Sequence, residues 1–265
     1  MGNFLALVKN ENMKIYRRPR TYVMMGIIVG LVLLISILWL SFGGSDTSMW
    51  EVAYLETTIL YMLVTIFAVI IAASIVAEEF STGTIKLLLI RPWSRSKILL
   101  SKYIAVLLFT LLFAVLLLAA TLLVNWLCFS LFSSTSTSSD IMGLAKDESP
   151  ISYLLKTYGL TFISTIMTVT MAFMLSTIFR SSALAIGMAL FLLLVVNNLL
   201  MLLAALKYKW IDYVLFIHLN LTQYLSDFPM REGMTLQFSL IVLACYWVVF
   251  VALTWYIFNK RDVAA

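Results

Sequence analysis

Charged residues are scarce in this chain. Asp, Glu, Lys and Arg make up 12% of its 265 residues, whereas 63% are hydrophobic and the mean hydropathy is +1.03. Soluble domains carry about 25% charged residues, so this composition excludes a soluble globular protein. We predict an all-α integral membrane protein in which residues 1–265 form a single transmembrane domain. The net charge of +5 does not indicate a nucleic-acid partner, because the bases stand beside apolar runs and not on one folded basic face.

Residues that bind metals or activate nucleophiles are also few. One histidine (His218) and two cysteines (Cys128 and Cys245) cannot supply the three or four ligands of a usual metal site. None of the ten glycines is followed by lysine, so the chain has no P-loop for ATP, and it has no nucleophile elbow. We therefore predict that the chain is not an enzyme by itself and holds no metal or cofactor.

Long apolar runs fill most of the sequence. Six of them have the length of a membrane-spanning helix, at about 22–42, 55–77, 103–127, 157–179, 182–204 and 236–258. With the N-terminus inside, thirteen bases fall on the cytoplasmic side and five on the outer side. The positive-inside rule then predicts a multi-pass protein of the cell membrane with both termini in the cytoplasm.

Two segments outside the spans also show helical patterning. Residues 1–20 alternate apolar positions with five bases, which predicts an interfacial amphipathic helix on anionic lipid headgroups. In the outer segment 205–235, Leu215, His218 and Leu221 recur at helical spacing. They indicate a re-entrant outer helix that acts as a gate before the last span, although a helix resting on the headgroups is the alternative.

Polar positions inside the spans have two interpretations each. We take the six spans to contain no Asp, Glu, Lys or Arg. This absence argues against an ion-coupled carrier, which needs a carboxylate within the membrane. The pair Gly26-x-x-x-Gly30 allows close helix approach, as a subunit contact or by chance. A polar patch on the transport path, or plain hydrogen bonds between helices, would explain the remaining set: Thr165, Thr168, Asn197 and Asn198.

The segment 78–102 between the second and third spans is charged and patterned. Two acids (Glu78 and Glu79) precede Gly83-Thr84, a leucine-rich turn and an Arg-Pro-Trp-Ser-Arg run. Pro92 would end a short helix there. The residues leave two interpretations open, namely an amphipathic helix gripped by another protein or a loop that only fixes topology.

This segment resembles the first cytoplasmic loop of type-2 ABC exporter permeases. That loop has a Glu, a Gly-Thr, a leucine-rich turn, a Pro shortly before Ser-Arg, and a Lys that opens the third span; Trp93 departs from the small residue common there. The resemblance extends over the whole chain and implies a coupling helix seated in a groove of a separate ATPase. The residues that it assigns to ATPase coupling are Glu78, Glu79, Gly83, Thr84, Leu87, Leu88, Arg91, Pro92, Arg95 and Lys102.

The resemblance implies a complex of two permeases and two ATPase subunits, in which the ATPases bind ATP and Mg. The second permease would be an identical copy or a paralogue, and membrane lipids would surround both. We expect this chain to form the path of an ATP-driven exporter for a hydrophobic or amphipathic substrate such as an antimicrobial peptide, a lipid-like compound or a drug. The alternatives are a passive channel, an ion-coupled carrier, or a non-transport membrane assembly factor.

Overall fold

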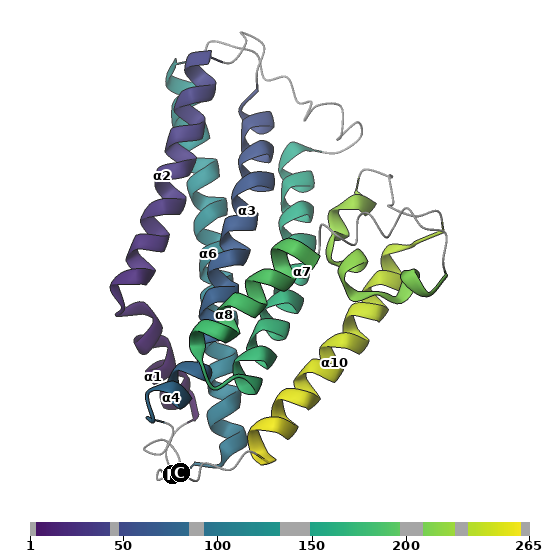
Figure 1. Ribbon diagram of the computed structural model, residues 1–265. Coiled ribbons are helices and arrows are strands. Elements are labelled where there is room, and N and C mark those ends of the chain that lie inside the picture. The colour runs from purple at the N-terminus through teal and green to yellow at the C-terminus, as the bar shows by residue number, and fades with distance from the viewer. Residues whose placement is uncertain are drawn as a thin grey trace. The chain divides into compact units, whose positions relative to one another are not determined.

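The computed structural model describes residues 4–42, 48–84, 93–132, 149–196, 209–225 and 233–260. Every regular element within these ranges is helical (Figure 1). The helices are α1 (Phe4–Tyr16), α2 (Pro19–Phe42), α3 (Met49–Ser74), α4 (Ala77–Ser81), α6 (Arg95–Phe132), α7 (Pro150–Ile178), α8 (Ser182–Phe191) and α10 (Leu236–Lys260). The expected all-α architecture is therefore found.

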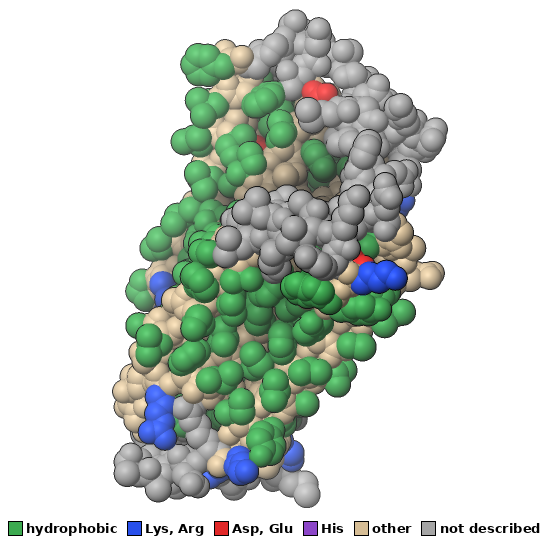
Figure 2. All heavy atoms as spheres, turned by 45° about the vertical axis from the view of Figure 1, so that its right-hand side comes forward, with side chains coloured by type: hydrophobic (Ala, Val, Ile, Leu, Met, Phe, Trp, Pro, Cys, Tyr) green, Lys and Arg blue, Asp and Glu red, His purple; other side chains and the backbone are tan. Residues whose placement is uncertain are grey.

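Five helices are long and apolar enough to cross a membrane, which makes the chain a multi-pass membrane protein. They cover Pro19–Phe42, Met49–Ser81, Arg95–Phe129, Pro150–Ile178 and Leu236–Lys260. Hydrophobic side chains cover most of the described surface in the view of Figure 2. In place of the predicted span 182–204, α8 runs into a π-helical turn, η1 (Leu192–Val196), and the remainder lies outside the described residues.

Three helices begin at least six residues earlier than the hydropathy pattern predicts. Helix α3 begins at Met49 rather than at residue 55 because Ser48 and Glu51 form a reciprocal capping box, in which each backbone N–H donates to the other side chain at 3.3 Å. Helix α6 begins at Arg95 and α7 at Pro150. Residues 95–102, predicted to belong to the cytoplasmic loop, are therefore the first turns of α6.

The chain divides into two compact units. Unit 1 comprises Met1–Arg17, Thr65–Thr110 and Ile163–Ala265. At its centre the Tyr103 hydroxyl lies 2.7 Å from the hydroxyl of Thr170 and accepts a hydrogen bond from Trp247 Nε1 at 2.9 Å. These contacts join α6 to α7 and α10.

Unit 2 comprises Arg18–Val64 and Leu111–Phe162. Tyr158 of α7 packs edge-on against Tyr61 of α3, with ring centroids 5.4 Å apart. Helix α2 is held through a narrow stripe that ends at Ser36. Gly26 and Gly30 lie on its exposed side, and a Cβ at either would meet nothing within 4 Å. Within the described chain neither glycine serves a close helix contact, so a contact with a second subunit stays a prediction.

The outer segment is not the single α-helix predicted within residues 205–235. It forms three short 3₁₀ helices, η2 (Lys209–Tyr213), η3 (Leu215–Leu219) and η4 (Leu221–Tyr224). The predicted buried positions are nonetheless buried, because an i, i+3 repeat faces one side of a 3₁₀ helix as well. Leu215, His218 and Leu221 are 4% exposed or less, and η3 and η4 pack on α10. Whether this segment re-enters the membrane stays a prediction.

Candidate functional site

The site begins where α3 gives way to α4, within unit 1. Helix α4 is only five residues long, and its first turn is anchored by α7. The Ser176 hydroxyl of α7 accepts hydrogen bonds from the backbone N–H groups of Val76 and Ala77, both at 3.0 Å. Ser176 is fully buried and so satisfies two donors that a helix start would otherwise leave unpaired.

Helix α4 ends at a left-handed glycine. Gly83 has φ +71°, a conformation that residues with a Cβ rarely adopt. The Thr82 hydroxyl donates to the Glu78 carbonyl at 2.7 Å and lies 3.0 Å from the Thr84 hydroxyl. These contacts fix the direction in which the chain leaves α4 toward residues 85–92.

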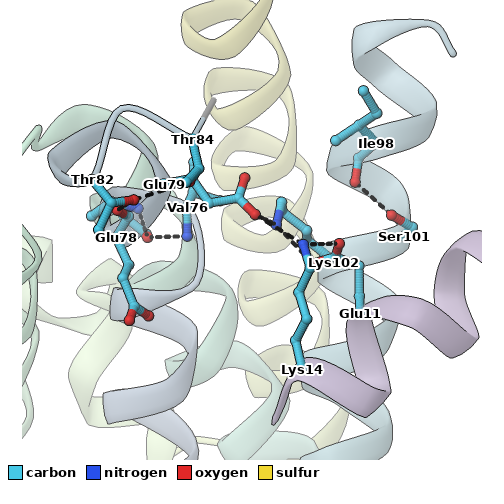
Figure 3. A network of polar contacts seen from close by, with 12 residues as sticks. Glu11, Lys14, Val76, Glu78, Glu79, Thr82, Thr84, Ile98, Ser101 and Lys102 are labelled. Atoms are coloured by element: carbon cyan, nitrogen blue, oxygen red, sulfur yellow. Dashed lines mark hydrogen bonds and ion pairs between the residues drawn. The ribbon is translucent and has the colours of Figure 1, made fainter. Parts of the chain in front are cut away.

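A buried ion-pair network holds this turn to α1 and α6 (Figure 3). The ammonium of Lys102 on α6 donates to Glu11 Oε2 at 2.7 Å and to Glu79 Oε1 at 2.6 Å. Lys14 donates to Glu11 Oε1 at 2.7 Å and to Glu79 Oε1 at 3.3 Å. Two carboxylates and two ammonium groups make the network electrically neutral. We refer to Glu11, Lys14, Glu79 and Lys102 as the clamp.

Burial makes the clamp costly to break. The Lys102 and Glu11 side chains are 1% and 2% exposed, and removal of one partner from such a pair leaves a buried charge that costs about 3–5 kcal/mol. Burial alone would raise the pKa of Glu11, but Lys102 and Lys14 together hold that pKa below its ordinary value. Burial would likewise lower the pKa of Lys14, yet Glu11 and Glu79 raise it.

The structure separates the residues that the resemblance assigned to ATPase coupling. Glu79 and Lys102 meet in the clamp, while the Glu78 side chain points away from it (Figure 3). Arg95 donates to the backbone carbonyl of Asn259 at 3.2 Å. Leu87, Leu88, Arg91 and Pro92 lie outside the described residues.

Sequence reasoning missed Glu11, Lys14 and Ser176. We placed an apolar face of the N-terminal helix toward lipid, but the buried residues of α1 are Leu7, Val8, Glu11 and Ile15. A signal was present, because Glu11 is the single acid among five bases in residues 1–20 and lies one turn from Val8 and Ile15.

The outer 3₁₀ segment contains a second polar group, around His218. A carbonyl can only accept, so His218 Nε2–H donates to the Asp212 carbonyl at 2.8 Å, and Nδ1 is left to accept from the Ser239 hydroxyl, also at 2.8 Å. The Tyr224 hydroxyl lies 2.6 Å from Ser239 Oγ and supplies the next donor. This arrangement suits a neutral imidazole, and burial lowers the pKa of His218.

The premise that the spans carry no charged residue is wrong. Glu56 lies inside the predicted span 55–77, seven residues after the start of α3, and its side chain is fully buried. Its carboxyl contacts Ser36 of α2 and Asn125 of α6. The argument against ion coupling, which rested on that premise, therefore fails.

The two threonines of the predicted polar path, Thr165 and Thr168, contact hydrogen-bonding groups within the described structure. The Thr165 hydroxyl lies 3.2 Å from that of Thr65, and Thr168 donates to the Ser164 carbonyl at 3.0 Å. Both threonines are nearly buried, which favours packing between helices. Asn197 and Asn198 lie outside the described residues.

Comparison with known proteins gives the family. Residues 22–264 match the family described as "Protein of unknown function (DUF2705)". The chain belongs to this family. "Uncharacterized protein YhcI" of Bacillus subtilis (strain 168) is 42% identical over 224 residues, which are 83% of this chain and 71% of that protein. "Uncharacterized membrane protein YdbK" of the same strain is 31% identical over 237 residues, 88% of this chain and 90% of that protein. The name of the second relative agrees with the apolar helices found here.

Proposed function

We propose that this chain is the membrane-spanning permease subunit of an ATP-driven exporter, coupled to a separate ATPase. The observation that carries the proposal is the clamp. It ties α1, α4 and α6 together at the two ends of the segment 85–92, which resembles the coupling loop of type-2 ABC permeases. A loop that receives force from a soluble ATPase must pass that force to the spans and needs a firm attachment to them. A loop that only sets topology needs no such attachment.

Specific contacts attach the loop to the helices on both of its sides. Before the loop, Ser176 holds the start of α4 and Gly83 sets its exit. After the loop, α6 starts at Arg95 and carries Lys102 two turns later. A displacement of the loop would therefore reach α1 through Glu11 and α7 through Ser176. The proposal places this end of the unit in the cytoplasm, in line with the distribution of bases.

An apolar groove supports a hydrophobic or amphipathic substrate. It has a volume of about 330 Å³ between α7 and α10, and it is lined by Ile163, Ile166, Met167, Leu240, Leu243, Ala244 and Trp247. Ligand sites in proteins are mostly apolar with a few polar groups. The antimicrobial peptide, the lipid-like compound and the drug named above all fit this chemistry.

A proton-coupled carrier is the second candidate, and Glu56 favours it. A carboxylate buried within a span marks the ion pathway in many transporters. The two candidates differ in their energy source. The ATP-driven exporter requires the ATPase and is indifferent to the proton gradient, whereas the carrier stops when an uncoupler is added.

The decisive test uses Leu88→Asp, with Lys97→Gln as its control on an exposed side chain of α6. We expect an ATPase to co-purify with the full chain from its native membrane and to be lost in Leu88→Asp, while Lys97→Gln retains it. Substrate-stimulated ATP hydrolysis should follow the same order. Normal co-purification and hydrolysis in Leu88→Asp, with the protein in the membrane, would reduce this loop to a topology signal.

Orientation is tested separately. In a chain without its two native cysteines, Ser94→Cys and Ser138→Cys should be labelled from opposite sides, with Ser138→Cys reached by an impermeant reagent in intact cells. Labelling of both from one side would contradict the assignment of the clamp to the cytoplasmic end.

A further inference from the structure

Glu56 sits in a closed hydrogen-bonded ring inside unit 2. Its Oε1 lies 2.7 Å from Ser36 Oγ, and its Oε2 accepts from Asn125 Nδ2 at 2.7 Å. Ser36 Oγ also lies 3.3 Å from Asn125 Oδ1, which closes the ring. The Glu56 and Ser36 side chains are 0% exposed and Asn125 is 1% exposed. The ring joins α2, α3 and α6.

The orientation of the Asn125 amide is fixed by a fourth contact. Asn125 Nδ2 also lies 2.9 Å from the Thr121 carbonyl oxygen. Because a carbonyl can only accept, the amide nitrogen must face it, and both hydrogens of Nδ2 are then used, one on Thr121 and one on Glu56. Asn125 Oδ1 therefore faces Ser36 and requires a donor from it.

Counting hydrogens decides the charge state of Glu56. Ser36 has one hydroxyl hydrogen, yet it faces two acceptors if Glu56 is ionised, namely Glu56 Oε1 and Asn125 Oδ1. If Glu56 carries a proton on Oε1, that proton is donated to Ser36 Oγ and the Ser36 hydrogen goes to Asn125 Oδ1. Every contact in the ring then has one donor and one acceptor, so the geometry fits a neutral carboxylic acid.

Among the residues that the structure describes, none that faces Glu56 carries a positive charge. The titratable side chains that face it are Cys128 from α6 and Tyr158 from α7, both uncharged in their ordinary state at neutral pH. The remaining polar neighbour is the buried Thr121 side chain, whose hydroxyl carries no charge. An ionised carboxylate buried without a cation is costly, and such a group takes up a proton instead.

We propose that Glu56 is a proton-binding site whose proton completes the ring that holds α2 to α3 and α6. Loss of the proton leaves the ring one hydrogen short, so the Ser36–Asn125 contact is given up and α2 is held less firmly. The site goes beyond the proposed ATP-driven function, since it would operate in an exporter or in a carrier.

Infrared difference spectroscopy of the full chain in lipid nanodiscs tests the proposal. At neutral pH, wild type minus Glu56→Gln should contain the carbonyl stretch of one protonated carboxyl. Glu56→Gln should fold, because its amide can donate to Ser36 and accept from Asn125. The matched control is Glu51→Gln, which removes the half-exposed carboxyl of the α3 capping box and should leave that band in place.

A second variant keeps the test decisive if Glu56→Gln fails to fold. Ser36→Ala removes the acceptor of the Glu56 proton, so the carbonyl band should move while the band intensity stays. A spectrum in which Glu56 contributes only carboxylate bands at neutral pH would overturn the proposal. So would a band that disappears when sodium chloride replaces choline chloride at equal ionic strength, because the site would then bind a metal cation.

Discussion

Removal of the Lys102 charge should destabilise unit 1 far more than removal of any exposed base. In Lys102→Met the side chain keeps its approximate length and apolar character, so the loss is mainly electrostatic. Glu11 and Glu79 would then face each other with only Lys14 between them. Breaking a buried pair in this way costs about 3–5 kcal/mol. We expect the lower end of this range, because the Glu79 side chain is 12% exposed and water can reach it.

The measurement is unfolding of the purified chain in detergent by titration with a denaturing surfactant. The matched control is Lys97→Met, an exposed base on the same helix, which should unfold close to wild type because an exposed charge contributes little. Glu11→Gln should be partly rescued by Lys102→Met, and the double-mutant cycle gives the coupling of the pair. If Lys102→Met unfolds at the same surfactant concentration as Lys97→Met, Lys102 is solvated and the clamp does not attach the loop to the helices.

Three further outcomes follow from the same contacts. Gly83→Val should weaken the turn after α4 while Gly83→Asn is tolerated, since asparagine adopts a positive φ more readily; equal thermal stability of both variants would contradict this. Because the pKa of Glu11 is lowered, its stabilisation should be present above about pH 4.3 and lost as pH falls through its folded pKa, and Glu11→Gln should remove that dependence in pH-resolved unfolding. His218 also has a lowered pKa, so protonation at low pH should weaken the contacts of the neutral ring. Limited proteolysis of residues 209–225 should therefore increase as pH falls below about 6.5. The same increase in His218→Gln would contradict this explanation.

A substitution that tests how deeply the outer segment lies in the membrane must be made at a residue exposed on the protein surface. Leu215 and Leu221 are buried within the protein, so a lysine at either would be destabilising wherever the segment lies. Tyr213 is 62% exposed, and Tyr213→Lys should cost roughly 2.5 kcal/mol in hydrocarbon and almost nothing at the surface. Wild-type stability of Tyr213→Lys would place the segment on the membrane and not in it.

Hydropathy predicted the helices well and their ends poorly, for a physical reason. A span is recognised by its apolar length, so the predicted spans of α6 and α7 began directly after a lysine, at Lys102 and Lys156 respectively. The helix itself ends where its backbone donors are capped, at Ser48 and Glu51 for α3. At α6 the backbone N–H of Lys97 and Ile98 bond to the Ser94 carbonyl, and eight residues predicted as loop are helical.

The outer segment shows the limit of periodicity. The spacing of Leu215, His218 and Leu221 identified the buried face but could not distinguish an α-helix from consecutive 3₁₀ turns, because both return to the same face after three or four residues. In the structure, Ser239 of α10 contacts His218 Nδ1 at 2.8 Å, and Tyr224 of η4 contacts Ser239 Oγ at 2.6 Å. Such contacts between distant parts of the chain are not visible in a local pattern.

The chain accommodates buried acids in two opposite ways, and sequence reasoning missed Glu11 and overlooked Glu56. Two ammonium groups lie within 3.3 Å of Glu11 and Glu79 and hold the pKa of Glu11 below its ordinary value, so removal of a base exposes uncompensated charge. Glu56 faces only hydroxyl, amide and thiol groups in the described structure, so it is stable when it carries its own proton. Lys102→Met should therefore be destabilising and Glu56→Gln nearly neutral, although both variants replace one buried ionisable side chain. The difference depends on the partners of each acid, which a count of charges along the sequence cannot provide.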